Sequence, residues 1–292
     1  MSKVIVLVSL INGIATDYLN INDRAIHYGD GIFETILCHD NKLYYWQKHF
    51  QRLQMSANKL DVCCPQEDVL LKNIAKLLVA NDASSERAYA IKIILTRGLG
   101  ERGYAVTKNT MSNCLLFLST VEKSYSSLLS AQLLSGNLYL CKHQVSINES
   151  LAGIKHLNRL ENVLARNEWA NNNYIDGLML NANGQLIEGT MSNLFMIKGD
   201  QLITPSLKLS GVCGIMRDVI IESARVNKID VTIKDINFDE IIDMDTMFIS
   251  NSLIGMKSVV EFNGRRFDEN AIGDIIFNHL LETGGNYVQT IK

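Results

Sequence analysis

One lysine stands out because of the residues that surround it. Lys155 follows Gly153 and precedes a run in which Leu160, Val163 and Leu164 recur at helical spacing. The lysine therefore lies at a junction between elements, where its side chain can point into a cleft. Burial lowers the pKa of a lysine and makes it a nucleophilic amine that can capture a carbonyl carbon. The alternative is a surface lysine in front of a helix, and spacing alone favours that interpretation.

A carboxylate and a glycine-containing segment supply two further groups that such a lysine needs in cofactor chemistry. Glu188 ends an expected hairpin strand and precedes a polar corner that contains Ser192 and Asn193. Residues 211–217 form the expected start of a helix, whose free backbone N–H groups suit a phosphate. A pyridoxal 5′-phosphate enzyme requires a lysine, a group at the pyridine nitrogen and an anion site. Each pattern alone is also common in proteins that bind nothing.

The elements that must position these groups fall into two parts. Asn183 and Gly184 predict a two-residue hairpin turn just before the strand that ends at Glu188. The polar, serine-rich stretch 119–127 is the expected linker. Mixed strand and helix signals on both sides of it predict an α+β protein, with a smaller N-terminal domain at 1–120 and a larger C-terminal domain at 127–292.

Five segments resemble, in order and spacing, the fold type IV pyridoxal-phosphate family. This family includes D-amino acid aminotransferases, branched-chain aminotransferases and aminodeoxychorismate lyases. The segments are residues 22–35, 49–53, 151–161 around Lys155, 188–195 and 211–217, and they extend over nearly the whole chain. The resemblance implies a small α/β N-terminal domain, a larger cofactor-binding domain with a β pseudo-barrel and helices, and a homodimer.

The resemblance also implies roles for the matching residues. Lys155 matches the lysine that forms a Schiff base with pyridoxal 5′-phosphate and later moves protons. Glu188 matches the carboxylate at the pyridine nitrogen, and Arg52 matches the arginine that grips the phosphate with its planar fork. Relatives often carry paired hydroxyls at the positions of Asn251 and Ser252, so Asn251 departs from the pattern. The full set of expected cofactor ligands is Lys155, Arg52, Glu188, Ser192, Asn193, Gly214, Ile215, Met216, Asn251 and Ser252.

The residues around Lys155 resemble the lyases of this family more than the aminotransferases. Thr35 and the loop at 97–104 also resemble their lyase counterparts. The similarity implies elimination of pyruvate from 4-amino-4-deoxychorismate to give 4-aminobenzoate, with Lys155 and Thr35 as catalytic residues. A D-amino acid or branched-chain aminotransferase, with the same cofactor residues, is the alternative activity, and a binding module that keeps only the fold is a third.

Three residues near the N-terminal segments are candidates for binding the substrate: Arg97, Arg102 and Tyr28. Each has an ordinary alternative, because arginines of a glycine-rich loop are usually on the surface and an aromatic ring there often packs. Asp30, between Gly29 and Gly31, is expected to be a turn residue rather than a catalyst.

Composition argues against several other functions. The chain has 292 residues, a net charge of -3 and no long basic run, which argues against binding of nucleic acid. Its six cysteines show no C-x-x-C pair and its six histidines no H-x-x-x-H pair, so a metal site is not expected. Reduced thiols in such a chain favour a cytoplasmic protein. The apolar run at 4–10 is too short to span a membrane and is expected to form a buried first strand.

Overall fold

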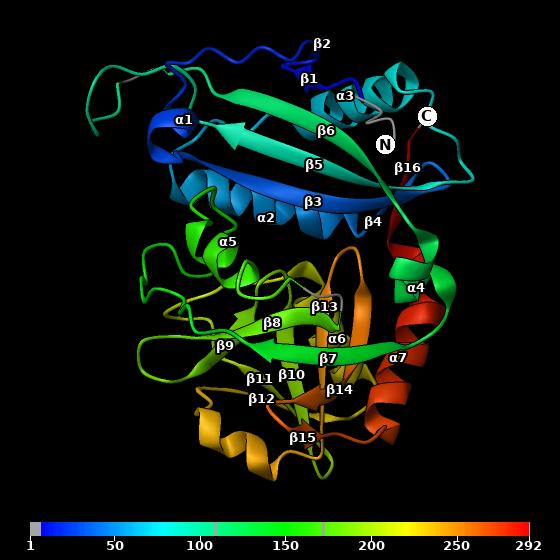
Figure 1. Cartoon of the computed structure of the whole chain (residues 1–292). Helices are drawn as coiled ribbons and strands as arrows, with labels where there is room; N and C mark the ends of the chain where they lie inside the picture. The colour runs from blue at the N-terminus through cyan, green and yellow to red at the C-terminus, as the bar shows by residue number, and fades with distance from the viewer. Residues whose placement is uncertain (1–6, 108–109, 171–172, 292) are drawn as a thin grey trace. The chain divides into compact units, whose positions relative to one another are not determined.

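The computed structural model describes residues 7–107, 110–170 and 173–291, and the chain divides into two compact units (Figure 1). Unit 1 comprises residues 1–123, 155–158 and 287–292, and unit 2 comprises residues 124–154 and 159–286. The division differs from the expected linker at 119–127, because strand β6 continues to Val121 and helix α4 already begins at Ser127. Two short segments from later in the chain also return to unit 1, which the sequence does not indicate.

Unit 1 contains a seven-stranded sheet with the order β16-β4-β3-β5-β6-β1-β2, and all neighbouring strands are antiparallel. Strands β3 and β5 pair along their full lengths, from Gly31 opposite Thr96 to His39 opposite Ala88. Residues 4–6 of the expected strand at 4–10 lie outside the described residues, residues 7–9 are not in a strand, and β1 begins only at Leu10. The strands are β1 (Leu10–Ile11), β2 (Ile14–Ala15), β3 (Gly31–His39), β4 (Lys42–Tyr44), β5 (Ala88–Thr96), β6 (Asn113–Val121) and β16 (Val288–Thr290).

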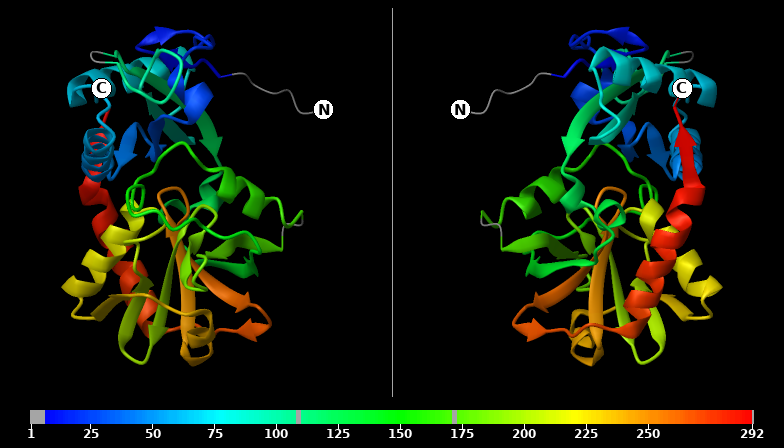
Figure 2. Two further views of the ribbon diagram at one scale, coloured as in Figure 1. Left: turned by 90° about the vertical axis from the view of Figure 1, so that its left-hand side faces the viewer. Right: turned by 90° about the vertical axis from the view of Figure 1, so that its right-hand side faces the viewer.

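Helices α2 (Trp46–Lys59) and α3 (Glu67–Ala80) cover one face of this sheet, whereas the short helix α1 (Arg24–Tyr28) precedes β3 (Figures 1 and 2). Along β3, Ile32 and Ile36 are fully buried while Phe33 and Thr35 are only half-buried. Alternation of this kind is typical of a strand with one covered face. The side of β3 that carries Glu34 therefore faces α2, and the side that carries Phe33 and Thr35 is the more open one.

Six strands of unit 2 close into a barrel in the order β10-β13-β14-β7-β8-β9, because β9 pairs with β10 as well as with β8. Strands β11 and β12 continue the sheet beyond β10, and β15 pairs with β14. Gly184, with a φ of +75°, lies in the predicted turn between β8 and β9. The strands are β7 (Leu134–Leu140), β8 (Tyr174–Leu180), β9 (Leu186–Gly189), β10 (Asn193–Lys198), β11 (Gln201–Pro205), β12 (Asp230–Lys234), β13 (Thr246–Asn251), β14 (Gly255–Phe262) and β15 (Arg265–Arg266).

The core of unit 2 consists of aliphatic side chains from the barrel strands, such as Leu178, Leu194, Met247 and Ile249, all of them fully buried. Helices α6 (Ile215–Val226) and α7 (Ala271–Gly284) contact each other, and α6 packs on β13 (Figure 2). The remaining helical elements are η1 (Lys123–Tyr125), α4 (Ser127–Ser130), α5 (Leu160–Arg166), η2 (Phe238–Asp243) and η3 (Gly285–Tyr287).

Candidate active site

Lys155 lies beside the first residues of β3 in unit 1. The Phe33 N–H donates to the Lys155 carbonyl at 2.9 Å, and the Leu157 N–H donates to the Gly31 carbonyl at 3.0 Å. This edge of β3 accommodates the lysine segment because β4 pairs only with Cys38 and His39. The sequence predicted a junction in front of a helix, and the structure adds that the junction is fixed by β-type pairing.

The ammonium group of Lys155 lies over an aromatic ring on the more open side of β3. Its Nζ is 4.4 Å from the centre of the Phe33 ring, and the Nζ of Lys92 is 5.0 Å from the same centre. Thr35 lies two residues beyond Phe33, and side chains two residues apart share one face of a strand. The structure therefore brings Thr35 to the face on which Lys155 holds its amine.

Arg52 lies on the other side of β3, on helix α2. It is 9% exposed, and its Nε and Nη2 donate to the two carboxylate oxygens of Glu34 at 2.8 and 2.6 Å. His49, one helical turn earlier, contacts the same carboxylate through Nδ1 at 2.6 Å. The family motif at 49–53 indicated a role for Arg52 alone. The contacts with Glu34 and His49 were missed because the motif does not show that α2 packs on β3.

Glu188 in unit 2 is held at the end of β9. The carboxylate is 4% exposed, and its Oε2 accepts a hydrogen bond from the Val212 N–H at 2.8 Å. Asn193 lies opposite Glu188 in the sheet and donates through Nδ2 to the Val212 carbonyl at 2.9 Å. The N–H and the C=O of Val212 are thus both hydrogen-bonded to expected site residues, and Gly211, with a φ of +83°, provides the turn.

The segment that these contacts hold leads directly into α6, whose first residues are the expected Ile215 and Met216. Gly214 is the N-cap, so no N-cap side chain accepts a hydrogen bond from the first turn of the helix. A Cβ on Gly214 would overlap Oδ1 of Asn193, so the close approach requires glycine. No side chain caps the backbone N–H groups of the first helical turn, and binding of an anion there stays a prediction.

Arg217 adds a buried cation at this helix start, and the sequence analysis did not assign it a role. It lies in the first turn of α6, is 6% exposed, and its Nε has no hydrogen-bond partner among the described residues. Burial lowers its pKa, and its only carboxylate contact in the described part of the chain is with the half-exposed Asp218, at 3.7 Å. A cation in the first turn opposes the helix dipole unless an anion binds there. An arginine three residues after an N-cap glycine is the signal that could have indicated it.

Ser192 and Asn251, both expected to bind the cofactor, are hydrogen-bonded to other protein groups in the structure. The Ser192 hydroxyl donates to Oδ2 of Asp176 at 2.6 Å. Asn251 donates to the Met191 carbonyl at 3.1 Å, and its Oδ1 accepts the Leu253 and Ile254 N–H groups at 2.9 Å. Asn251 therefore shapes the turn after β13, in line with its departure from the family pattern. The neighbouring Ser252 is half-buried in that turn.

Asp176 is a buried carboxylate that the sequence analysis missed. One oxygen accepts the Thr190 hydroxyl at 2.5 Å and the other the Ser192 hydroxyl, while the backbone N–H groups of Gly177, Thr190 and Met191 also donate to it. Burial raises its pKa, and these hydrogen bonds act in the opposite direction. The carboxylate fixes the turn between Glu188 and Asn193. An aspartate within an apolar strand was the available signal.

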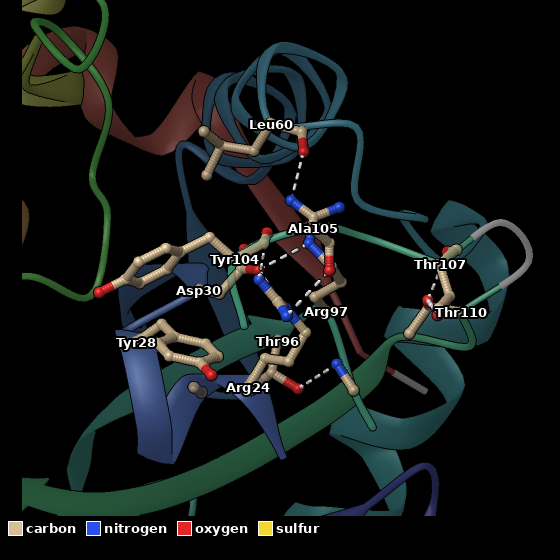
Figure 3. A network of polar contacts seen from close by, with 12 residues as sticks. Arg24, Tyr28, Asp30, Leu60, Thr96, Arg97, Tyr104, Ala105, Thr107 and Thr110 are labelled. Carbon is tan, nitrogen blue, oxygen red and sulfur yellow. Dashed lines mark hydrogen bonds and ion pairs between the residues drawn. The ribbon is translucent and has the colours of Figure 1, made fainter. Parts of the chain in front are cut away.

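Arg97 has a structural role, which is the ordinary alternative for this residue (Figure 3). Its guanidinium donates to Asp30 at 2.7 Å, to the Asp61 carbonyl at 2.7 Å and to the Leu60 carbonyl at 2.6 Å. The side chain is 8% exposed. A substrate carboxylate would have to displace these partners, so the geometry does not support the expected substrate contact by Arg97. Arg102, by contrast, is exposed and stays the candidate.

Asp30 was expected to be a turn residue. In the structure its carboxylate instead joins Arg24 and Arg97. The Nε groups of Arg24 and Arg97 donate to the same Asp30 oxygen, at 2.8 and 2.7 Å. Burial would raise the pKa of Asp30, but the hydrogen bonds and charges of Arg97 and Arg24 hold it below its usual value. Gly29, with a φ of +63°, is the residue that ends α1.

Arg24 and Tyr28 hold the glycine-rich loop that follows β5. Arg24 is 4% exposed and donates to three successive carbonyls, of Gly103, Tyr104 and Ala105, at 3.0, 3.1 and 3.4 Å (Figure 3). The Tyr28 hydroxyl accepts the Gly103 N–H at 3.1 Å, and its ring lies 5.3 Å from that of Tyr104. Tyr28 therefore positions the loop that presents Arg102, and direct contact between Tyr28 and substrate stays a prediction.

Each unit taken by itself fits part of pyridoxal 5′-phosphate. Unit 2 has a helix start without a side-chain cap, a buried cation with an unpartnered Nε in its first turn, and a buried carboxylate nearby in the sheet. Unit 1 has a lysine amine and a buried arginine, of the types that bind an aldehyde carbon and a phosphate. Within the described ranges, no group of three or more histidine, cysteine, aspartate or glutamate residues could hold a metal ion.

Comparisons with known proteins agree with these features. The family model of amino-transferase class IV matches residues 31–262. An aminodeoxychorismate lyase of Vibrio harveyi is 31% identical over 257 residues, which are 85% of this chain and 89% of the relative. A D-alanine aminotransferase of Listeria monocytogenes is 27% identical over 88% of this chain and 86% of its own length.

A solved structure extends the comparison to the fold. The 4-amino-4-deoxychorismate lyase of Pseudomonas aeruginosa superposes with a TM-score of 0.82 at 29% identity. The alignment covers 94% of this chain and 98% of that one. Among the described residues, no helix is long and apolar enough to cross a membrane.

Proposed function

Because the chain belongs to the amino-transferase class IV family, we propose that it is a pyridoxal 5′-phosphate enzyme that converts 4-amino-4-deoxychorismate into 4-aminobenzoate and pyruvate. The similarity to two lyases, at 31% and 29% identity over most of the chain, supports this activity. The observation that carries the elimination is the placement of Thr35 on the side of β3 where Lys155 holds its amine. 4-Aminobenzoate is a precursor of folate, so the reaction belongs to folate biosynthesis.

Lys155 has two tasks in this proposal. Its amine would hold the cofactor through the aldehyde carbon, and the released amine would remove the proton from the amine-bearing ring carbon of the substrate. When bound, the cofactor supplies a protonated pyridine ring that accepts the electrons released at that carbon. The enolpyruvyl group would then leave the neighbouring ether carbon with the electrons of the C–O bond and take up a proton to become pyruvate, and the ring would become aromatic. Thr35 orients the Lys155 amine or delivers a proton during the elimination.

Other residues hold the cofactor and the substrate. Glu188 keeps the pyridine nitrogen protonated, a role for which a buried carboxylate is suited. Arg52 and the N–H groups of Ile215 and Met216 bind the phosphate, with Arg217 adding positive charge at the same helix start. The remaining expected ligands, Ser192, Asn193, Gly214, Asn251 and Ser252, act mainly by shaping the polar turns around it. Arg102 binds a substrate carboxylate.

We also propose a homodimer. Helix α5 exposes an apolar face, because Leu160, Val163 and Leu164 are 71%, 50% and 47% exposed and only Ala165 of this helix is buried. Met191, 55% exposed, belongs to the turn that α5 contacts through the hydrogen bond from Asn162 to the Thr190 carbonyl. A second copy of the chain is the partner that would cover this face. A cytoplasmic location is supported by six cysteines that form no disulfide.

A direct assay tests the proposed activity. Purified enzyme receives 4-amino-4-deoxychorismate without any keto acid, and the fluorescence of 4-aminobenzoate and the release of pyruvate are followed. We expect equal amounts of the two products and no turnover by Lys155→Ala. A requirement for a keto acid would instead support the alternative, an aminotransferase for D- or branched-chain amino acids, which the similarity to D-alanine aminotransferases favours. A protein that shows no visible absorbance band after addition of the cofactor would be the binding module.

A further inference from the structure

A buried polar cluster lies where β3 meets α2 in unit 1, and it consists of Glu34, His49 and Arg52. Glu34 is 2% exposed and His49 is 1% exposed. The two oxygens of Glu34 accept hydrogen bonds from the Nε and Nη2 of Arg52, and one of them also contacts Nδ1 of His49. The carboxylate thus engages one edge of the guanidinium through two parallel bonds, the arrangement with the strictest geometry for this pair of groups.

The charge states within the cluster follow from its surroundings. Burial would raise the pKa of Glu34, but the charge of Arg52 and the hydrogen bonds from Arg52 and His49 lower it to about 2. Burial lowers the pKa of His49, and the charges of Arg52 and Lys155 lower it further, against the opposite effect of Glu34. At neutral pH the cluster is therefore an ionised carboxylate, a guanidinium and a neutral imidazole.

The contacts also fix which nitrogen of His49 carries the proton. An ionised carboxylate can only accept, so the Nδ1 that lies 2.6 Å from Glu34 must donate. Nε2 is then an acceptor, and it is buried without a hydrogen-bond partner in the described part of the chain. His49 and Arg52 lie one turn apart on α2, and both donate to Oε2 of Glu34.

Stability alone does not explain such a cluster. Removing three polar groups from water costs several kcal/mol per charge, and apolar side chains of similar size are often as stable or more so. Phe50 and Leu53 of the same helix already pack as ordinary core residues. What the cluster provides is orientation: with its Nε–Nη2 edge engaged by Glu34, the guanidinium plane of Arg52 cannot rotate, and the direction of its remaining donors is set.

We propose that Glu34 and His49 are positioning residues for Arg52 and that they set the affinity of the enzyme for the phosphate of its cofactor. This inference rests on the proposed function, because it takes Arg52 as a ligand of the pyridoxal 5′-phosphate phosphate group. Glu34 fixes the guanidinium directly. His49 acts through Glu34, by holding the carboxylate in the rotamer that reaches both nitrogens.

The test compares two ligands that differ only in the phosphate. Apo-enzyme is titrated with pyridoxal 5′-phosphate and with pyridoxal, and the visible absorbance of the lysine-bound form gives a Kd for each. We expect Glu34→Gln to raise the Kd of the phosphorylated ligand on the order of 10-fold to 100-fold, the range for residues that orient a binding group from behind. The Kd of pyridoxal should change by less than about 2-fold, because that ligand lacks the group that Arg52 would bind.

Two further measurements separate positioning from general damage. In an Arg52→Lys background, Glu34→Gln should not change the ratio of the two Kd values any further, because the guanidinium through which Glu34 acts is already absent. Asp30→Asn is the matched control, because it disturbs another arginine–carboxylate pair of unit 1 and should leave the ratio of the two Kd values unchanged. If Glu34→Gln does not fold, Glu34→Asp keeps the charge but is too short to span both nitrogens, and an intermediate loss is expected.

The outcomes are distinct. Equal weakening of both ligands by the Glu34 variants, or no weakening of either, overturns the positioning role while the lyase assay can still succeed. A wild-type enzyme that binds pyridoxal as tightly as pyridoxal 5′-phosphate would overturn the proposed cofactor together with this inference. A selective loss for the phosphorylated ligand that disappears in the Arg52→Lys background supports it.

Discussion

Replacing Arg97 by methionine tests whether this arginine supports a loop or binds the substrate. The side chain is 8% exposed and donates three hydrogen bonds, to Asp30, Leu60 and Asp61. Each hydrogen bond from a charged donor contributes about 1.5–3 kcal/mol. Methionine keeps the apolar stem, the exposed Asp61 regains water at its carbonyl, and Asp30 keeps Arg24. We therefore expect the free energy of unfolding to fall by about 2–4 kcal/mol, which is well below the sum of three such hydrogen bonds.

The assay pairs equilibrium unfolding in urea with steady-state kinetics, and Arg102→Met is the comparison. In a Trp169→Phe background, which removes the tryptophan of unit 2, the fluorescence of Trp46, buried in α2, reports on unit 1. Because Arg102 is exposed, its replacement should change the free energy of unfolding by less than about 0.5 kcal/mol. It should lower kcat/KM on the order of 10-fold to 100-fold, through loss of a charge-assisted bond to a substrate carboxylate. An Arg97→Met enzyme that is as stable as the wild type and differs only in a higher KM would refute the structural role.

The remaining predictions concern acid stability, the helix start, the elimination step and assembly. The pKa of Glu34 is about 2 in the folded state against 4.5 in the unfolded chain, so its stabilising effect is complete above pH 4.5 and disappears as the pH falls toward 2. When the free energy of unfolding is measured over this pH range, the wild type should lose about 3 kcal/mol that the Glu34→Gln variant does not lose. Gly214→Ala places a Cβ on Oδ1 of Asn193 and should lower both the Tm and the cofactor affinity, and an unchanged Tm would contradict the close approach. Thr35→Val should reduce kcat in the lyase assay at least about 10-fold without changing cofactor affinity, and full turnover would remove Thr35 from the mechanism. Leu160→Lys should shift sedimentation from dimer toward monomer, whereas an unchanged dimer would place the interface elsewhere.

The predictions from sequence were most successful where neighbouring residues decide the outcome. The two-domain α+β fold is confirmed, and the turn at Gly184 and the helix start at Gly214 form as expected because glycine and local hydrogen bonds specify them. Glu188 and Asn193 also come together, since both flank one tight turn. Local signals of this kind can be read without knowing the rest of the structure.

Contacts between distant segments could not be predicted in the same way. Arg97 looks like any loop arginine until Asp30 and Leu60, far away in the sequence, are brought to it by strand pairing and by the end of α2. The partnership of Glu34 with Arg52 likewise depends on α2 packing on β3. In both cases the residue types were visible, but a guanidinium has the same sequence signature whether it binds a ligand or a neighbouring carbonyl.

The way in which unit 1 completes its sheet has a consequence for how the chain is made. Residues 155–158 pair with the free edge of β3, and β16 pairs with β4. These strand pairs can form only after residues much later in the chain have been synthesised. On the ribosome, a nascent unit 1 therefore carries an open, partly apolar strand edge until residue 290 has emerged, which is the kind of edge that invites mispairing. A substitution or deletion within Val288–Thr290 should accordingly reduce the yield of correctly folded enzyme more than the activity of each molecule that folds.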